Sequence, residues 1–256
     1  MLETHGLAKI YEDGNIGLHD LNIQVQPGVL YALLGANGAG KSTTINLLLG
    51  FIQPSRGTAK INGLDVVAQP VETKRHIGYI PEQVALYGDL DVRTNLRYFG
   101  RLAGQNPSLE ECDRLLGEVG FPKEALSRKA RYLSKGMRQK VAIAAIKMKG
   151  AKLLLLDEPT SGLDPRAASE FFRLLSQLRA EGRAILMATH DLLRMHQLAD
   201  RVGIMKSGQR VTELTRGELD QQDLEQVYLG YMEREADEDH RPQLQKEVSG
   251  NATRTN

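Results

Sequence analysis

The sequence predicts an α/β fold built around a mainly parallel sheet, and three apolar stretches carry this prediction. Residues 28–34 and 184–187 form short apolar runs, and Leu153 to Leu156 is an unbroken run of leucines. Continuous apolar runs of this length are typical of strands buried on both faces of a parallel sheet. Between residues 151 and 206 such strands alternate with segments of helical periodicity, as expected for helices that cover a sheet.

Two regions beside this core have different patterns. Residues 2 to about 26 and 56–62 alternate between apolar and polar side chains, with Leu21, Ile23 and Val25 on one face. This alternation predicts an N-terminal antiparallel β subdomain. From about residue 87 to 148, leucines and small residues recur every three or four positions, which predicts an inserted α-helical subdomain.

The C-terminal part begins with a well-marked helix start and ends in a polar segment. Asp164-Pro165 combines a capping aspartate with a proline at the first helical position. Ser207-Gly208 predicts a hairpin turn, and residues 219–232 predict one more helix. We therefore expect one folded domain over 1–232. Residues 233–256 are polar, and we expect a disordered or partner-docking tail there.

The most specific motif is a glycine-rich loop between the strand at 28–34 and the helix at 43–49. It reads Gly35-Ala36-Asn37-Gly38-Ala39-Gly40-Lys41-Ser42 and fits the pattern G-x-x-x-x-G-K-[ST] in full. The glycines let backbone N–H groups face phosphate oxygens, where a Cβ atom would block them. Lys41 adds a positive charge for the β- and γ-phosphates, and Ser42 offers a hydroxyl to Mg²⁺. The sequence therefore predicts a P-loop NTPase core that binds a nucleoside triphosphate.

Two carboxylates follow the leucine run directly. Asp157 at the end of a buried strand is suited to hold Mg²⁺ through water, and Glu158 is suited to polarise an attacking water molecule. Acidic residues are also common at solvated strand ends, and that interpretation would be favoured for the pair alone. Beside a complete phosphate loop, the catalytic interpretation is favoured.

Three further motifs occur in order along the chain. They are Leu133-Ser134-Lys135-Gly136-Met137 before a helix, Ser161-Gly162-Leu163-Asp164, and Thr189-His190-Asp191 after a buried strand. With them the chain resembles the nucleotide-binding domain of ATP-binding-cassette (ABC) transporters from about residue 2 to 215. In its details it resembles the ATPase subunits of bacterial multidrug and polysaccharide-type exporters.

The resemblance implies a role for each matching residue of the nucleotide site. Tyr11 would stack on adenine, and the Walker A loop from Gly35 to Thr43 would hold the phosphates of ATP. Asp157 would be the Walker B aspartate and Glu158 the general base. His190 would contact the γ-phosphate, as would Lys41 of the loop.

Other matching residues imply a second subunit. Ser134 and Gly136 belong to the signature loop, which in this family closes over the γ-phosphate held by a partner subunit. Asp164 matches the loop that links the two nucleotide sites. One copy carries one Walker A loop and one signature loop, so we expect a head-to-tail dimer, with an identical copy as the expected partner.

Two departures from the family pattern stand out. The signature is usually L-S-G-G-Q, and here Lys135 and Met137 replace a glycine and the glutamine. Our hypothesis for Lys135 is that its charge compensates near the triphosphate. The loop that usually brings a glutamine to Mg²⁺ has Glu82 at that position by family spacing, with Gln83 as the alternative. The expected metal-contacting residues are thus Ser42, Asp157, and either Glu82 or Gln83.

Composition limits the partners and the compartment. Lys and Arg number 33 against 32 Asp and Glu, a balance that argues against a protein whose main work is gripping nucleic acid. A single cysteine, Cys112, excludes an internal disulfide and fits a reducing cytosol. Since no apolar run approaches the length of a membrane span, we expect any pore to belong to other, multi-span membrane permease subunits. We expect this chain on the cytoplasmic face of the membrane.

The expected function is therefore ATP hydrolysis that powers export through those membrane subunits by ATP-driven dimer closure. A soluble ABC ATPase acting on ribosomes or DNA is a rival, disfavoured because this chain lacks a second cassette, heptads and cysteine pairs. A nucleotide-dependent interaction module without turnover is a second rival, opposed by Glu158 and His190. A cassette of an importer, or of a complex that extracts lipids or lipoproteins, is a third.

Overall fold

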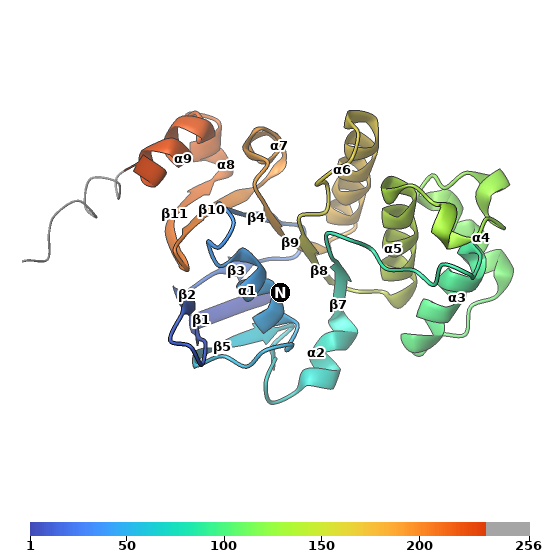
Figure 1. Cartoon of the computed structure of the whole chain (residues 1–256), viewed down its shortest axis with the longest axis horizontal. Coiled ribbons are helices and arrows are strands. Elements are labelled where there is room, and N and C mark those ends of the chain that lie inside the picture. Colours follow the sequence, from blue (N-terminus) through green and yellow to red (C-terminus); the bar gives the residue numbers. More distant parts are fainter. Residues whose placement is uncertain (234–256) are drawn as a thin grey trace, which may run out of the picture.

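A computed structural model describes residues 1–233, and its largest element is a six-stranded sheet through the centre of the molecule (Figure 1). The strand order is β11-β10-β4-β9-β8-β7, and all neighbours are parallel except β10 and β11. The strands are β4 (Leu30–Leu34), β7 (Ile77–Ile80), β8 (Leu153–Asp157), β9 (Ala184–Thr189), β10 (Arg201–Lys206) and β11 (Gln209–Thr215). This confirms the predicted α/β core with a mainly parallel sheet.

Both faces of this sheet are buried, which explains the unbroken apolar runs. In β8, Leu153 and Leu155 join one core cluster, whereas Leu154 and Leu156 join another. Successive side chains of a strand point to opposite faces, so each face of the sheet has its own core. Helix α1 (Lys41–Leu48) packs on one face, and the residues of α6 (Pro165–Ala180) belong to the core of the other.

A second sheet lies on the α1 side and is antiparallel throughout. Its order is β2-β1-β5-β6, with β3 paired to β1. The elements are β1 (Leu2–Ile10), β2 (Ile16–Leu21), β3 (Gln24–Val25), β5 (Arg56–Ile61) and β6 (Leu64–Asp65), with α2 (Pro70–His76) leading on to β7. The alternating N-terminal segments thus form the predicted antiparallel subdomain.

The segment between β7 and β8 is helical, as predicted. It contains α3 (Val92–Leu102), α4 (Leu109–Glu118), two 3₁₀ turns (Lys123–Ala125 and Ala130–Tyr132) and α5 (Lys135–Lys149). In Figure 1, α3 and α4 lie at the end of the molecule opposite β1 and β2, with α5 between them and the sheet. Helix α5 contacts α3, α4, α6 and β7, and so joins the helical segment to the sheet.

The C-terminal region corrects one prediction. Residues 219–232 do not form one helix, since α8 (Arg216–Leu219) and α9 (Leu224–Glu233) are separated by a turn. Thr215 and Glu218 form a capping box that starts α8 several residues early, and Asp223 accepts a hydrogen bond from the Glu225 N–H at the start of α9. Helix α7 (Leu192–Leu198) precedes this region. The predicted tail, apart from Glu233, lies outside the described residues.

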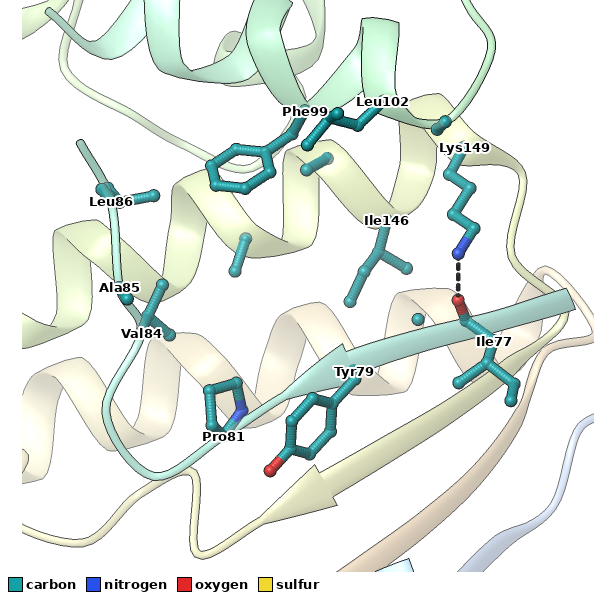
Figure 2. Close-up of a pocket in the computed structure, with 14 residues that line it drawn as sticks. Ile77, Tyr79, Pro81, Val84, Ala85, Leu86, Phe99, Leu102, Ile146 and Lys149 are labelled. Carbon is teal, nitrogen blue, oxygen red and sulfur yellow. Dashed lines mark hydrogen bonds between the residues drawn. The ribbon is translucent and has the colours of Figure 1, made fainter. Parts of the chain in front are cut away.

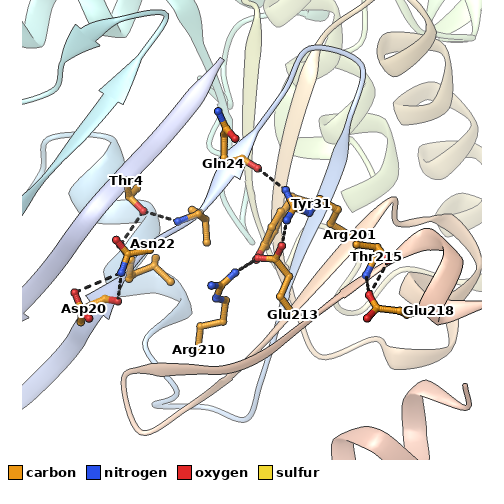
Figure 3. A network of polar contacts seen from close by, with 12 residues as sticks. Thr4, Asp20, Asn22, Gln24, Tyr31, Arg201, Arg210, Glu213, Thr215 and Glu218 are labelled. Atoms are coloured by element: carbon orange, nitrogen blue, oxygen red, sulfur yellow. Dashed lines mark hydrogen bonds and ion pairs between the residues drawn. The ribbon is translucent and has the colours of Figure 1, made fainter.

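A partly buried polar network stabilises the edge of the central sheet (Figure 3). The hydroxyl of Tyr31 on β4 donates to Oε2 of Glu213 on β11 at 2.6 Å, and Arg201 and Arg210 both pair with the same carboxylate. Burial raises the pKa of Tyr31 to about 12, even though the two arginines act in the opposite direction. Arg201 also donates to the carbonyl of Gln24 on β3, so the network reaches the second sheet.

No helix within residues 1–233 combines the length and the apolar character needed to cross a membrane.

Candidate nucleotide site

Most of the predicted nucleotide-binding residues line one cavity of about 430 Å³. It lies beyond the carboxyl ends of β4 and β8, the edge at which ligands bind in sheets of this type. The residues that line it are Tyr11, Asn15, Ile16, Gly17, residues 36–43, Glu82, Asp157 and Glu158.

The glycine-rich loop has a backbone that requires glycine. Gly38 has a φ of 82° and Gly40 a φ of 99°, and a Cβ atom on Gly40 would lie 2.8 Å from the carbonyl oxygen of Gly17. Lys41 begins α1 and is 5% exposed. Its Nζ atom donates to the carbonyl of Gly35 at 2.6 Å and to that of Ala36 at 3.2 Å. The loop therefore surrounds the Lys41 ammonium group beside the cavity. There the ammonium group and the loop amides can bind phosphate oxygens.

The two carboxylates after β8 have different surroundings. Oδ1 of Asp157 accepts a hydrogen bond from the hydroxyl of Ser42 at 3.3 Å. Burial raises the pKa of Asp157, an effect that the Ser42 hydrogen bond opposes. Glu158 has a φ of 44°, in the left-handed region that non-glycine residues rarely adopt. Such strain at a cavity edge is typical of functional positions.

The Glu158 carboxylate lies between two cationic or potentially cationic groups. Its Oε1 atom is 3.5 Å from Nζ of Lys41, and its Oε2 atom is 2.9 Å from Nδ1 of His190. Oε1 is buried and accepts no hydrogen bond from the described residues. His190 follows β9 directly and is largely exposed. The structure thus brings Lys41, Glu158 and His190 together from three separate parts of the chain.

Of the two alternatives for the metal-contacting loop, the structure places Glu82 at the cavity. Its Oε1 atom accepts a hydrogen bond from the Ser161 hydroxyl at 3.1 Å. Gln83 is exposed and does not line the cavity. Glu82 thus lies at the cavity that would hold the nucleotide, and its contact with Mg²⁺ stays a prediction.

The donor set at the cavity fits Mg²⁺ bound together with phosphates. Ser42, Asp157 and Glu82 offer oxygen atoms, which Mg²⁺ prefers. Within residues 1–233, no group of three or more His, Cys, Asp or Glu side chains is arranged as a metal site. Mg²⁺ commonly takes only one or two carboxylates from a protein and completes its shell with phosphates and water, so an incomplete protein shell suits it.

Tyr11 lines the cavity, with its hydroxyl 3.3 Å from Oγ1 of Thr43. Gly17, which the sequence reading did not single out, allows this placement. A Cβ atom on Gly17 would lie 2.4 Å from Cε2 of Tyr11 and 3.2 Å from the Thr43 side chain. The available signal was a glycine inside a strand, which often marks a close approach. Asn15 and Ile16 also line the cavity and were not predicted.

The remaining predicted residues lie elsewhere in the chain. Ser134 caps α5 by accepting from the Met137 N–H at 3.3 Å, and it lines a separate small cavity together with Gly136. Asp164 caps α6 by accepting from the Ala167 N–H at 2.9 Å. A single copy of the chain therefore does not bring Ser134, Gly136 or Asp164 to the cavity that contains Lys41.

Comparison with known proteins identifies the family of this chain. Residues 18–161, more than half of the 256-residue chain, match the family described as ABC transporter. This chain belongs to the ABC transporter family. The phosphate loop and Asp157-Glu158 both lie within the matched residues.

The relatives are ATP-binding proteins of transporters. The chain is 36% identical over 220 residues to the daunorubicin/doxorubicin resistance ATP-binding protein DrrA of Streptomyces peucetius, covering 85% of this chain and 66% of DrrA. It is 33% identical to the Nod factor export ATP-binding protein I of Cupriavidus metallidurans, covering 83% of this chain and 70% of the relative. The chain thus spans slightly less than two thirds of DrrA.

A solved structure described as the ATP-binding subunit of an ABC transporter is similar to this chain, with a TM-score of 0.78 and 32% identity. The match covers 91% of this chain and 99% of the solved one. Fold and sequence therefore agree that this chain is an ATP-binding cassette.

Proposed function

We propose that this cassette hydrolyses ATP and thereby powers export of a substrate through separate membrane subunits. The observation that carries the proposal is the Glu158 carboxylate, fixed between Lys41 and His190 at the edge of the phosphate-loop cavity. A carboxylate beside a triphosphate site, with one oxygen free of hydrogen bonds, is suited to accept a proton from an attacking water molecule.

The other residues of the cavity would prepare ATP for this attack. Tyr11 would stack on the adenine, and the loop amides with Lys41 would hold the phosphates. Ser42, Asp157 and Glu82 would hold Mg²⁺, which neutralises charge on the β- and γ-phosphates when bound. His190 would then steady both the carboxylate and the γ-phosphate. No single side chain performs the reaction, since catalysis of phosphoryl transfer depends mainly on positioning and charge.

In a single chain, the signature loop does not reach the nucleotide cavity. We propose that a second copy of the chain supplies this loop. Ser134 and Gly136 would face the nucleotide of the partner in a head-to-tail dimer with twofold symmetry, and Asp164 would lie between the two sites. ATP would bind the closed dimer better than the open one and so shift the equilibrium towards closure. Loss of the γ-phosphate contacts after hydrolysis would allow the dimer to reopen.

An apolar groove beside Glu82 supports a membrane partner. Figure 2 shows this groove between β7, the loop that follows it, and helices α3 and α5. Its volume is about 390 Å³, and on its rim Leu102 is 67% exposed. Pro81, the neighbour of Glu82, forms part of its wall. We propose that an apolar segment of the membrane permease subunit docks here, so that movement of the Glu82 loop reaches the membrane.

Export is favoured by the relatives and by the two departures from the family pattern. Two proteins more than 30% identical to this chain are named for drug resistance and for Nod factor export. Their cargoes differ although their cassettes are alike, so we expect the membrane subunits to select the cargo. This chain would then lie on the cytoplasmic face of the membrane, held there by its permease.

Two experiments test the proposal. Phosphate release by the purified chain with ATP and Mg²⁺ should be measurable and should depend on Glu158. The tagged chain, purified from detergent-solubilised membranes of its native host, should carry a multi-span membrane protein in stoichiometric amount. Recovery with ribosomes or DNA from the soluble fraction would instead favour a soluble ABC ATPase.

A variant of the groove separates docking from catalysis. Ala145 lines the groove from α5, and Ala145→Glu places a charge in an apolar groove that contains no residue of the phosphate loop. We expect the membrane protein to be lost while nucleotide binding is kept. Leu193→Glu is the matched control, because Leu193 is 71% exposed and lies outside the groove.

A further inference from the structure

The lysine that departs from the family signature makes a specific contact. Lys135 is the first residue of α5, and its Nζ atom donates to the carbonyl oxygen of Ser161 at 2.5 Å. Its ammonium group therefore contacts its own chain rather than extending freely into solvent. The earlier hypothesis, that this charge compensates near a triphosphate, does not describe this contact.

A second residue of α5 grips the same loop. Gln139 lies one turn after Lys135 on the same face of the helix, and its Nε2 donates to the carbonyl of Pro159. The loop between β8 and α6 is thus fastened to α5 through two backbone carbonyls, those of residues 159 and 161. This loop runs from Glu158 to Asp164, so its position affects both residues.

Ser161 extends the contact to the nucleotide cavity. While its carbonyl accepts from Lys135, its hydroxyl donates to Oε1 of Glu82 at 3.1 Å. Three segments distant in sequence, at 82, 135 and 161, are therefore linked in a short chain of hydrogen bonds. Its first bond carries a full charge on the donor and its second a full charge on the acceptor, and such bonds are stronger than neutral ones.

Helix energetics do not account for a lysine at this position. A positive charge in the first turn of a helix is disfavoured by the helix dipole, and α5 has no acidic residue there to offset it. The contact with Ser161 compensates for this disadvantage. A glycine at the same position would leave the Ser161 carbonyl without this donor.

We propose that Lys135 is a positioning residue that acts through Ser161 to hold the Glu82 carboxylate at the edge of the nucleotide cavity. This inference rests on the proposed role of Glu82 toward Mg²⁺. It connects the start of the signature helix to the metal side of the site within one subunit. Any movement of α5 then moves the Ser161 loop, and with it Glu82.

The test measures binding rather than turnover. The affinity of a non-hydrolysable ATP analogue is determined by calorimetry with Mg²⁺ and with EDTA, and the ratio of the two dissociation constants gives the Mg²⁺ effect. In Lys135→Met we expect this effect to fall about threefold to tenfold, the range of one ordinary hydrogen bond, because the lost bond acts on Glu82 only through Ser161, and we expect the EDTA affinity to stay unchanged. Lys135→Arg keeps a charged donor and should stay close to the wild-type protein.

Two further variants show whether the residues act in series. Ser161→Ala removes the hydroxyl and keeps the carbonyl, so it should lose the same share of the Mg²⁺ effect. The double variant Lys135→Met/Ser161→Ala should lose no more than Ser161→Ala alone; additive losses would overturn the series. Lys147→Met removes a charge from the far end of α5, where Lys147 pairs with Glu118 and Glu181, and should leave the Mg²⁺ effect intact.

The possible failures are distinguishable. A wild-type protein that binds the analogue equally with and without Mg²⁺ would refute the metal site of the proposed function, and this inference with it. A normal wild-type effect that Lys135→Met leaves intact would overturn the Lys135 inference alone. Hydrogen exchange without nucleotide gives an independent readout, because the amides of residues 160–164 should exchange faster in Lys135→Met and not in Lys147→Met.

Discussion

His190 and Glu158 are joined side chain to side chain, with Nδ1 of the imidazole 2.9 Å from Oε2 of the carboxylate. The two residues follow neighbouring parallel strands, β9 and β8, which place them at the same edge of the sheet. The other carboxylate oxygen faces Lys41. Glu158 is thus oriented from both sides by side chains of its own chain, and groups held in place in this way need little reorganisation during catalysis.

The first prediction concerns this carboxylate. Glu158→Gln keeps the shape of the side chain and removes its basicity, so phosphate release should fall by about 10²-fold or more. ATP binding should persist, and the variant should elute as a dimer in gel filtration with ATP and Mg²⁺. Glu181→Gln, which alters a surface ion pair with Lys147, is the control and should resemble the wild-type protein. A monomeric Glu158→Gln protein under these conditions would contradict the closure mechanism.

The second prediction concerns the floor of the cavity. Lys41→Ala removes the ammonium group that donates to the Gly35 and Ala36 carbonyls. The loop therefore loses these two hydrogen bonds and the positive charge that would bind phosphate. We expect ATP affinity, measured by calorimetry, to fall on the order of 10- to 100-fold, as for the loss of a charged hydrogen-bond donor. An affinity within twofold of wild type would show that the nucleotide binds elsewhere.

The third prediction concerns Gly17 and Tyr11, which line the nucleotide cavity. Gly17→Ala places a methyl group where the ring of Tyr11 lies, so the ring must move away from its position beside Thr43. Since stacking contributes about 1–3 kcal/mol per base, ATP affinity should fall about fivefold or more. Gly117→Ala in α4 is the matched control, because no atom lies within 4 Å of its added Cβ. Equal affinities for the two variants would argue against adenine stacking on Tyr11.

The fourth prediction concerns pH and the network of Tyr31. Its pKa is about 12 in the folded protein against 10.0 normally, so the folded state keeps a proton that the unfolded chain releases above pH 10. Stability must therefore fall as the pH rises from 10 to 12, by a total approaching about 3 kcal/mol from this group.

Tyr31→Phe isolates this contribution. At pH 8 the variant should be about 1 kcal/mol less stable in urea unfolding, because the hydrogen bond to Glu213 is lost. The difference from the wild-type protein should shrink above pH 10 and then reverse, since phenylalanine has no proton to lose. A constant difference up to pH 11.5 would show that Tyr31 ionises normally.

The features that were predicted most accurately are those that depend on residues close together in the chain. The phosphate loop, the capping residue Asp164 and the hairpin at Ser207-Gly208 each depend on neighbours in the chain, and all three were found where expected. The runs at Leu153 to Leu156 and 184–187 predicted the central strands, because burial on both faces leaves an unbroken apolar pattern.

What could not be predicted depends on contacts between distant segments. Tyr31 looks like any apolar strand residue until β11 brings Glu213 to its hydroxyl. The close approach of Gly17 to Tyr11 and the link from Lys135 to Ser161 likewise arise only in the folded chain. The error at 219–232 has a local cause, since the capping box of Thr215 and Glu218 outweighed an apolar pattern that seemed continuous.

The backbone conformation of Glu158 is one that favours glycine, whereas the proposed reaction needs a carboxylate at this position. A left-handed conformation costs a non-glycine residue about 1–2 kcal/mol. Glycine adopts this conformation without that cost, so Glu158→Gly is expected to melt at a higher temperature than Glu158→Ala, which loses the same ion pairs with Lys41 and His190, while neither variant releases phosphate. The residue that suits this backbone best is therefore one that has no carboxylate to accept a proton from water.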